Sequence, residues 1–249
     1  MTGTREGPRR LCRAGARRTR AWVSWSTGKD SAFALHLAQQ DQRTEIAGLF
    51  TTVEDDAGTV AYNGVPLGLA HAQAAALGLP LHLLRIPAGC PARTREVLRR
   101  DVLAREALPA GITTIVFGDA AGTDIRASRA ARLAGLGIGA AFPLWGTGTR
   151  RLCRMILAAG IRAVITRADP LVLDAGWAGQ CYGDDFIAAL DPGVDPCGEN
   201  GEFHTFTCDS PDFTWPVPAR LERITRRDVS VYAELAEAGC GAGEARRPA

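Results

Sequence analysis

The sequence predicts an α/β fold in which a doubly wound parallel sheet is followed by a smaller α+β region. Strand-like and helix-like segments alternate from residue 21 to about residue 167, which is typical of parallel strands joined by helices. Residues 113–117 are mostly β-branched, as expected for a strand buried on both faces. Beyond residue 175 the alternation weakens, and Gly, Pro and Asp become frequent.

Each element follows from its local composition. Short apolar or β-branched runs predict strands, in chain order, at 21–24, 46–52, 81–86, 113–117 and 163–166. Longer segments with helical spacing predict helices at 32–40, 67–77, 93–107, 125–136 and 150–159. Gly78 is placed to end the second helix. This order divides the chain into a disordered basic tail (1–20), a first domain (21–174), a smaller substrate-binding region (175–235) and a disordered C-terminal tail (236–249).

The composition is that of a globular protein, with 46% hydrophobic residues in a chain of 249. No apolar run approaches the ~20 residues that a membrane-spanning helix needs, so no membrane contact is expected. The seven Arg and single Glu of residues 1–20 contribute +6 to the formal net charge of +2, which leaves −4 for the rest. An acidic body offers no general surface for nucleic acid, and no stable nucleic-acid partner is expected.

The basic tail and the cysteines indicate the cellular compartment of the protein. Residues 1–20 are interpreted as a disordered extension, with a targeting peptide or a nucleic-acid-binding arm as alternatives. The seven Cys are scattered and include no CxxC pair, which is typical of reduced thiols in a cytoplasm and argues against a structural zinc site. The oligomeric state stays open, a homo-oligomer included.

Residues 26–31 are the first candidate binding site, a phosphate-binding loop between the first strand and the first helix. The N–H groups of Thr27, Gly28 and Lys29 and the helix dipole favour an anion there. Lys29 is the only Lys of a chain with 28 Arg, as expected where a compact ammonium is required. A Walker A loop needs Ser or Thr after the Lys, and Asp30 excludes it. An ordinary strand–helix turn is the alternative.

The string Ser24-Trp-Ser-Thr-Gly-Lys-Asp-Ser31 resembles the pyrophosphate loop of the N-type ATP pyrophosphatases, or PP-loop superfamily, except that Thr27 replaces a Gly. Members of this superfamily adenylate a carboxylate or a carbonyl-like oxygen and release pyrophosphate. The resemblance implies a HUP-type, PP-loop ATPase-like domain that uses ATP and Mg²⁺. The nucleotide-binding residues it implies, including two at the ends of later strands, are Ser24, Ser26, Thr27, Gly28, Lys29, Asp30, Ser31, Thr51 and Gly118.

Residues 193–206 are the second candidate site. Polar side chains are concentrated there around a Gly: Glu199, Asn200, Glu202 and His204. The Gly and Pro residues predict a tight loop whose backbone approaches a ligand. A metal site formed with Cys197 would have poor ligand spacing, and a solvated hairpin is the other alternative.

The string CGENGEFHTF at 197–206 resembles the diphthine–ammonia ligase family, especially its bacterial branch. Further similar strings lie at 73–80, 117–119, 124–126, 132–135 and 142–146. This family couples ATP cleavage to amide formation, with ammonia attacking an acyl-adenylate. Five residues depart from the family on the acceptor side: Asn63, Pro66, Ser128, Ala130 and Ala131. The carboxylate acceptor, a small molecule or a protein, is therefore expected to differ from that of the family.

On the nucleotide side, the resemblance implies that Lys29 and Mg²⁺ neutralise the leaving pyrophosphate. Asp30 and Asp119 are the candidate Mg²⁺ ligands, and Asp119 is also a candidate catalytic residue.

On the acceptor side, the resemblance implies that Arg126 holds the carboxylate. It also implies that the second segment positions ammonia, takes its proton or contacts the acceptor through Glu199, Asn200, Glu202 and His204. Two alternatives come from other classes: a nucleotide-binding sensor without catalysis, and an ATP-dependent RNA-modifying enzyme such as a tRNA thiolase. The thiolase would require a basic face and a reactive Cys.

Overall fold

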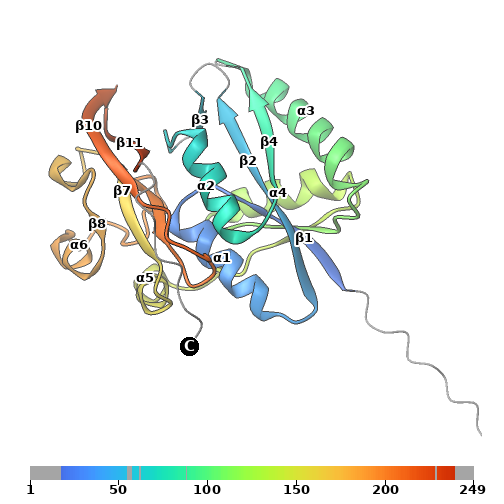
Figure 1. Ribbon diagram of the computed structural model, residues 1–249, viewed down its shortest axis with the longest axis horizontal. Coiled ribbons are helices and arrows are strands. Elements are labelled where there is room, and N and C mark those ends of the chain that lie inside the picture. The colour runs from blue at the N-terminus through green and yellow to red at the C-terminus, as the bar shows by residue number, and fades with distance from the viewer. Residues whose placement is uncertain (1–17, 55–57, 62, 88, 228, 239–249) are drawn as a thin grey trace, which may run out of the picture.

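The computed structural model describes residues 18–54, 58–61, 63–87, 89–227 and 229–238, and it contains two sheets that lie side by side (Figure 1). The fold class predicted from the sequence is confirmed, because a helix-flanked parallel sheet is followed by a second, antiparallel sheet. Most of the two predicted tails, residues 1–17 and 239–249, lies outside the described residues. Within the described ranges, no helix is long and apolar enough to cross a membrane.

The first sheet has the strand order β3-β2-β1-β5-β6, and β4 also pairs with β2. Every pair is parallel except β2–β3. Its strands are β1 (Thr19–Ser24), β2 (Thr44–Glu54), β3 (Thr59–Val60), β4 (Leu81–Ile86), β5 (Thr114–Val116) and β6 (Gly139–Ala141). Because parallel strands end at the same edge, the loops after β1, β2 and β5 meet there, which is where ligands bind in such sheets.

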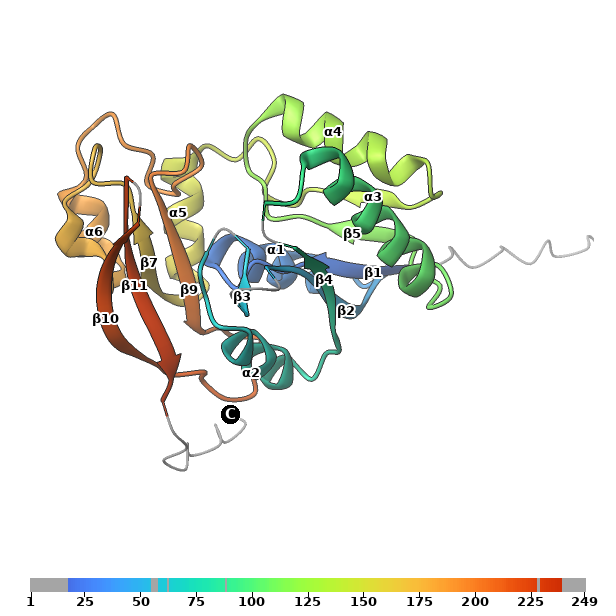
Figure 2. The same cartoon turned by 90° about the horizontal axis from the view of Figure 1, so that it is seen from above.

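Helices cover both faces of this sheet (Figure 2). They are α1 (Lys29–Gln40) and α2 (Leu67–Leu77) on the side of the second sheet, and α3 (Ala92–Val102) and α4 (Thr123–Ala134) on the other. A π-helical turn at Leu103–Ala107 continues α3. Side-chain alternation along β1 serves both faces: Trp22 packs into the core under α3 and α4, whereas Ala21 and Val23 pack into the core around α1 and α2.

The second sheet has the order β10-β11-β7-β8, with β9 also paired to β7, and all its pairs are antiparallel. Its strands are β7 (Arg162–Ala168), β8 (Cys181–Tyr182), β9 (Phe203–Asp209), β10 (Ala219–Arg227) and β11 (Ser230–Glu237). The helices α5 (Thr149–Ala158) and α6 (Asp184–Ala189) and a short 3-10 turn (Ala175–Trp177) accompany it. The core around α1 continues into this sheet through Phe203, Phe206 and Val231.

The strand predicted at 163–166 forms as β7, but its predicted place in the parallel sheet is wrong. The unpredicted β6 takes the edge of that sheet, and β7 pairs instead with β9 and β11. The sequence of β6, Gly-Ala-Ala, has no β-branched residue to mark it as a strand. The change of sheet thus falls before residue 174, and the division into domains at that residue stays a prediction.

The predicted N-terminal tail ends too late in the chain, and the predicted C-terminal tail begins too early. Thr19 and Arg20 belong to β1, where they pair with Thr44 and Glu45, and β11 extends to Glu237.

Candidate active site

The loop between β1 and α1 is held by a buried glutamine. The Gln73 side chain accepts a hydrogen bond from the Trp25 indole (2.8 Å) and donates to the carbonyls of Thr27 (3.1 Å) and Thr207 (2.7 Å). Thr27 has a φ of +68°, the only positive value at a described non-glycine residue. Because a β-branched residue rarely adopts this conformation, the surrounding bonds hold a strained peptide where the resembled superfamily has Gly.

Strand β9 of the second sheet covers this loop. The Thr207 N–H donates to the Thr27 carbonyl (2.9 Å), and the Lys29 N–H donates to the Thr205 hydroxyl (3.2 Å). A Cβ at Gly28 would lie 3.0 Å from the Thr205 carbonyl oxygen, so Gly28 lets the loop pass beneath the strand. The Lys29 N–H, expected to face a phosphate, is therefore paired with β9.

The loop serines face each other. Ser26 Oγ and Ser31 Oγ lie 3.2 Å apart, the Ser31 hydroxyl donates to the Gly28 carbonyl (2.9 Å), and the Gly28 N–H lies 3.4 Å from Ser26 Oγ. The Asn63 side chain donates to the Ser26 carbonyl. These contacts fix Ser26 at the tip of the loop, and two of the three N–H groups expected to face a phosphate already have partners.

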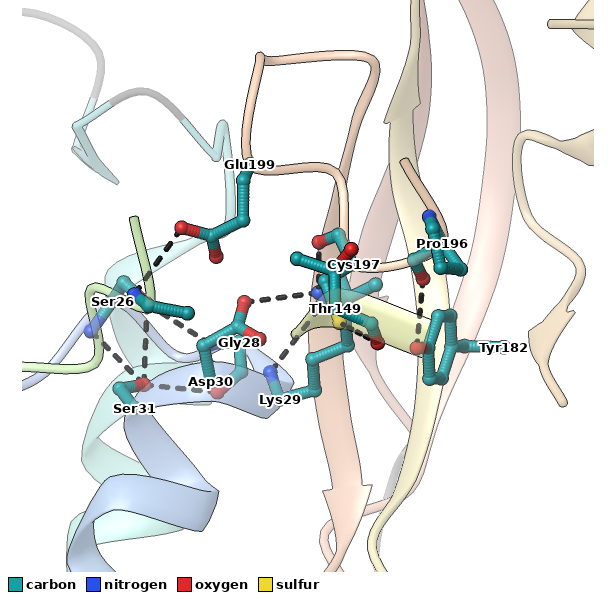
Figure 3. A network of polar contacts seen from close by, with 12 residues as sticks. Ser26, Gly28, Lys29, Asp30, Ser31, Thr149, Tyr182, Pro196, Cys197 and Glu199 are labelled. Atoms are coloured by element: carbon teal, nitrogen blue, oxygen red, sulfur yellow. Dashed lines mark hydrogen bonds and ion pairs between the residues drawn. The ribbon is translucent and has the colours of Figure 1, made fainter. Parts of the chain in front are cut away.

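The ammonium group of Lys29 points toward the second sheet (Figure 3). Nζ donates to Asp30 Oδ2 (2.9 Å) and to the Cys197 carbonyl (2.6 Å), and it lies 5.2 Å and 5.1 Å from the ring centroids of Tyr182 and Phe203. Burial by itself lowers the pKa of Lys29, but the charge and hydrogen bond of Asp30, together with Cys197 and Glu199, outweigh it, so that the pKa is raised. Lys29 therefore tethers the loop to the 193–206 segment. Its role on a pyrophosphate stays a prediction, and it requires one of these contacts to be exchanged.

A hollow of about 540 Å³, called here the large hollow, opens where β1, β2 and β5 end. Ser24, Ser26 and Thr51 line it at the strand ends. Apolar side chains form a recess, among them Phe50, Ile115, Phe117, Leu133 and Leu136. Arginines of α3 and α4 also line it: Arg99, Arg100, Arg129 and Arg132. Its volume and mixed lining are typical of a site for a small molecule or nucleotide.

Thr51 has an unsatisfied hydroxyl in this hollow. Its Oγ1 is buried and has no hydrogen-bond partner within the part of the chain that the structure describes. Because buried hydroxyl groups are nearly always paired, Thr51 Oγ1 fits a contact with a ligand.

A second hollow of about 250 Å³, called the small hollow, lies next to the loop tip. Its lining includes Asp30, Asn63 and His204. Ser26 and Ala61 line both hollows, so the two adjoin at the loop.

Glu199 links the second segment to the first sheet. Its carboxylate accepts hydrogen bonds from the N–H groups of Ala120 and Ala121, both at 3.2 Å, just after β5. Burial raises the pKa of Glu199 to about 7, and the charge of Asp30 contributes to the rise, while Lys29 and the two N–H groups oppose it. The structure thus places Glu199 beside the residues after β5 and near Asp30, and its catalytic role stays a prediction.

Glu202 and Asn200 bind each other instead of facing a ligand. Glu202 Oε1 accepts hydrogen bonds from the Asp195 N–H (3.2 Å) and the Asn200 side chain (2.9 Å), and Oε2 accepts one from the Asn200 N–H (3.0 Å). These bonds stabilise the turn that carries Glu199. Contact of either residue with the acceptor stays a prediction.

His204 lies on β9, with its Nε2 3.0 Å from Nη1 of Arg167 on β7. Burial, together with the positive charges of Arg167 and Lys29, lowers the pKa of His204 to about 4. The imidazole is therefore neutral at pH 7.

Arg126 lies in the first turn of α4, and Asp119 lies in the loop before that helix. Arg129 forms a bidentate ion pair with Asp119 (2.8 and 2.9 Å), so the predicted binding of Mg²⁺ by Asp119 would compete with Arg129. The Arg126 guanidinium lies 4.8 Å from the ring centroid of Trp145 and 5.5 Å from that of Phe142. This aromatic platform orients Arg126, while its carboxylate contact stays a prediction.

Gly118 packs against the start of α1. A Cβ there would lie 2.8 Å from the carbonyl carbon of Asp30, so a larger residue would displace the helix. The structure supports a packing role for Gly118, and its contact with a nucleotide stays a prediction.

A Mg²⁺ ion fits beside the loop at Asp30. Its Oδ1 is buried without a hydrogen-bond partner among the described residues, while Oδ2 binds Lys29. Within the described residues, no three His, Cys, Asp or Glu side chains converge as a metal-binding group. Mg²⁺ is usually held by one or two carboxylates plus substrate phosphates, so one free oxygen next to Ser26 suits it.

Four residues that shape the site were not predicted from the sequence: Asn63, Gln73, Arg167 and Thr205. Gln73 had a detectable signal in the sequence, because it is the one amide of the Ala-rich helix α2. Arg167 and Thr205 had none, because their partners depend on the pairing of β7 with β9 and on the packing of β9 against the loop.

Residues 19–127 match the family model for the diphthamide synthase N-terminal domain. The match covers the loop, Thr51, Gly118, Asp119 and Arg126, and it supports the resemblance to the PP-loop superfamily over this part of the chain. The 193–206 segment lies outside it. A comparison with curated proteins found no match.

Among solved structures, the chain is similar to the U34-tRNA thiolase NcsA from Methanococcus maripaludis, which carries a 4Fe–4S cluster. The sequence identity is 15% and the TM-score 0.37, over 57% of this chain and 58% of the thiolase.

The unpaired hydroxyl of Thr51 gives a first prediction. Thr51→Val should weaken ATP binding about two- to tenfold, the value of one hydrogen bond, without lowering the stability of the ligand-free protein. Thr166→Val is the matched control, because Thr166 Oγ1 is also buried and unpaired among the described residues but lies on β7 in the second sheet. Calorimetric titration with ATP and Mg²⁺ measures both. Equal affinities for the two variants would contradict a ligand contact at Thr51.

The raised pKa of Glu199 gives a second prediction, for the protein without ATP and Mg²⁺. Because the folded state holds this proton more tightly than the unfolded state, Glu199 costs stability as the pH rises from about 4.5 to about 7. Glu199→Gln should therefore gain about 2 kcal/mol in unfolding free energy, relative to the wild type, across that window. Urea unfolding at pH 4.5, 6 and 8 measures it, with Glu222→Gln on exposed β10 as the control. A pH-independent difference would contradict the raised pKa.

Proposed function

We propose that the protein is an ATP-dependent ligase that adenylates a carboxylate, releases pyrophosphate and transfers the acyl group to ammonia. ATP occupies the large hollow, with its phosphates at Ser26–Ser31, and the acceptor enters from the small hollow. The observation that carries the proposal is the junction of the two hollows at Ser26 and Ala61. A group held there lies next to the phosphates of a nucleotide bound at the loop.

The nucleotide side uses the start of α1. The hydroxyls of Ser26 and Ser31 and the positive end of the helix dipole face the β- and γ-phosphates. Asp30 Oδ1 holds Mg²⁺, which supplies the charge neutralisation that lets pyrophosphate leave. Thr51 Oγ1 binds the nucleoside end of ATP in the large hollow. The family match over residues 19–127 supports this half of the site.

On the acceptor side, Arg126 lines neither hollow in the ligand-free protein, and its side chain extends from the aromatic platform to hold the carboxylate. One carboxylate oxygen attacks the α-phosphorus, and the bond from the α-phosphorus to the pyrophosphate oxygen breaks. Ammonia then adds to the acyl carbon, gives a proton to Glu199, and the acyl bond to AMP breaks. Glu199 suits this step because its carboxylate is fixed by Ala120 and Ala121 at the edge of the first sheet.

An RNA-modifying enzyme would share the adenylation step and differ in the acceptor and the nucleophile. Burial raises the pKa of the thiols of Cys153, Cys197 and Cys208. None of these three is a ready thiolate, so none of them favours sulfur transfer.

Blocking the junction tests the proposal. Ala61→Phe should lower pyrophosphate release at least tenfold, because the ring separates the hollows while ATP, Mg²⁺, ammonium chloride and a metabolite extract are all present. Ala188→Phe on exposed α6 is the matched control. Circular dichroism checks that both variants fold.

The nature of the product separates the two classes. With ¹⁵N-ammonium chloride, the ligase predicts pyrophosphate together with a ¹⁵N-labelled amide. Pyrophosphate release that depends on added tRNA, with no ¹⁵N in any product, would contradict the ligase and favour RNA modification. Release that is equal in Ala61→Phe and Ala188→Phe would contradict the placement of the acceptor.

A further inference from the structure

Three side chains form a row across the second sheet. His204 on β9 is the register partner of Arg167 on β7, and Arg167 is the register partner of Tyr232 on β11. The Arg167 guanidinium lies 6.0 Å from the ring centroid of Tyr232, and its Nε donates to Ser230 Oγ (2.9 Å). Two neighbours on β11 thus hold Arg167 in place, and Nη1 extends from there to His204.

This contact determines where His204 carries its proton. A guanidinium group can only donate hydrogen bonds, so His204 Nε2 must present its lone pair to Arg167 Nη1 at 3.0 Å. In a neutral imidazole, the proton then resides on Nδ1. Nδ1 has no hydrogen-bond partner within the described residues, and His204 lines the small hollow.

We propose that Arg167 is a positioning residue that fixes His204 as a neutral hydrogen-bond donor, with its proton on Nδ1, for an oxygen of the ligand in the small hollow. The ligand class is a carboxylate or its acyl-adenylate, and this part of the inference rests on the proposed function. During attack by ammonia, negative charge grows on the acyl oxygen, and a fixed N–H stabilises it. His204 thus orients and polarises the acceptor, and it does not take the proton of ammonia.

The charges around the ring support this state. Arg167 from β7 and Lys29 from α1 face it with positive charge, and both disfavour an imidazolium. Asp30 lines the same hollow, but its Oδ2 is paired with Lys29. Burial acts in the same direction as the two cations, because it disfavours the charged ring.

Nitrogen NMR of the full chain tests the inference without any turnover. The sequence has four His, and in ¹⁵N-histidine-labelled protein His204→Gln identifies the signals of His204. At pH 7 the wild type should show protonated Nδ1 and unprotonated Nε2, without titration down to pH 5. Arg167→Met removes the guanidinium that donates to His204 Nε2. At least half of the His204 rings should then shift to the Nε2–H tautomer, and the ring should begin to titrate above pH 5.

Arg227→Met is the matched control, because Arg227 also lies over Tyr232, at 5.4 Å from the ring centroid, but forms its ion pair with Glu234. It should leave the His204 signals unchanged. Ser230→Ala removes only the bond to Arg167 Nε and should give a smaller shift in the same direction, which serves if Arg167→Met does not fold.

A wild-type Nε2–H tautomer, or unchanged His204 signals in both Arg167→Met and Ser230→Ala, would overturn the inference. The NMR result and the ligase activity can fail separately. If the tautomer is as proposed but ¹⁵N-ammonia is not incorporated, the fixed donor stands and the proposed function fails. If ¹⁵N-ammonia is incorporated but His204 carries its proton on Nε2, the proposed function stands and the fixed donor fails.

Discussion

The hydrogen bond from the Thr207 N–H to the Thr27 carbonyl joins the loop between β1 and α1 of the first sheet to β9 of the second. Gln73 reinforces it by donating to the carbonyls of both residues. This pairing holds Thr27 at φ +68°, a conformation that costs an L-residue about 1–2 kcal/mol. The loop shape therefore depends on the second sheet, and neither sheet builds the site alone.

The same packing sets the electrostatics. Lys29 is the only Lys of the chain and is 2% exposed, with its ammonium between Asp30, the Cys197 carbonyl and two aromatic rings. A buried cation must be compensated, and these contacts draw the 193–206 segment onto the loop. Glu199 is thereby placed near Asp30, where burial and like charge raise its pKa, and His204 is placed where burial and the charges of Arg167 and Lys29 lower its pKa. The contact of Lys29 with the Cys197 carbonyl thus accompanies a carboxyl group whose pKa is raised and an imidazole whose pKa is lowered.

The first sheet could be predicted because its signals are local. Helical spacing and short apolar runs identified four of its strands and the helices on both faces, and the strand–loop–helix order placed Ser26–Ser31 at the carboxyl edge. β6 was missed because Gly-Ala-Ala has no strand propensity. β7 was assigned to the wrong sheet because partner choice between a parallel and an antiparallel neighbour is not encoded in a seven-residue strand.

The site was predictable as a set of residues but not as a set of roles. Glu199, Glu202 and His204 stand within six positions in the sequence, yet Glu202 closes a turn, Glu199 binds N–H groups after β5, and His204 binds Arg167. These differences follow from register and burial, which pair residues far apart in the chain. The direction of Lys29 is of the same kind, since Cys197 lies 168 positions away.

If this site forms an adenylate reversibly, as proposed above, it catalyses the exchange of ³²P-pyrophosphate into ATP. With Mg²⁺, a metabolite extract and no ammonia, the acyl-adenylate should form and revert, so that label enters ATP. Exchange should depend on a heat-stable component of the extract and stop when ammonia consumes the intermediate. Conversion of ATP to ADP and phosphate, with no label entering ATP under any of these conditions, would contradict the account.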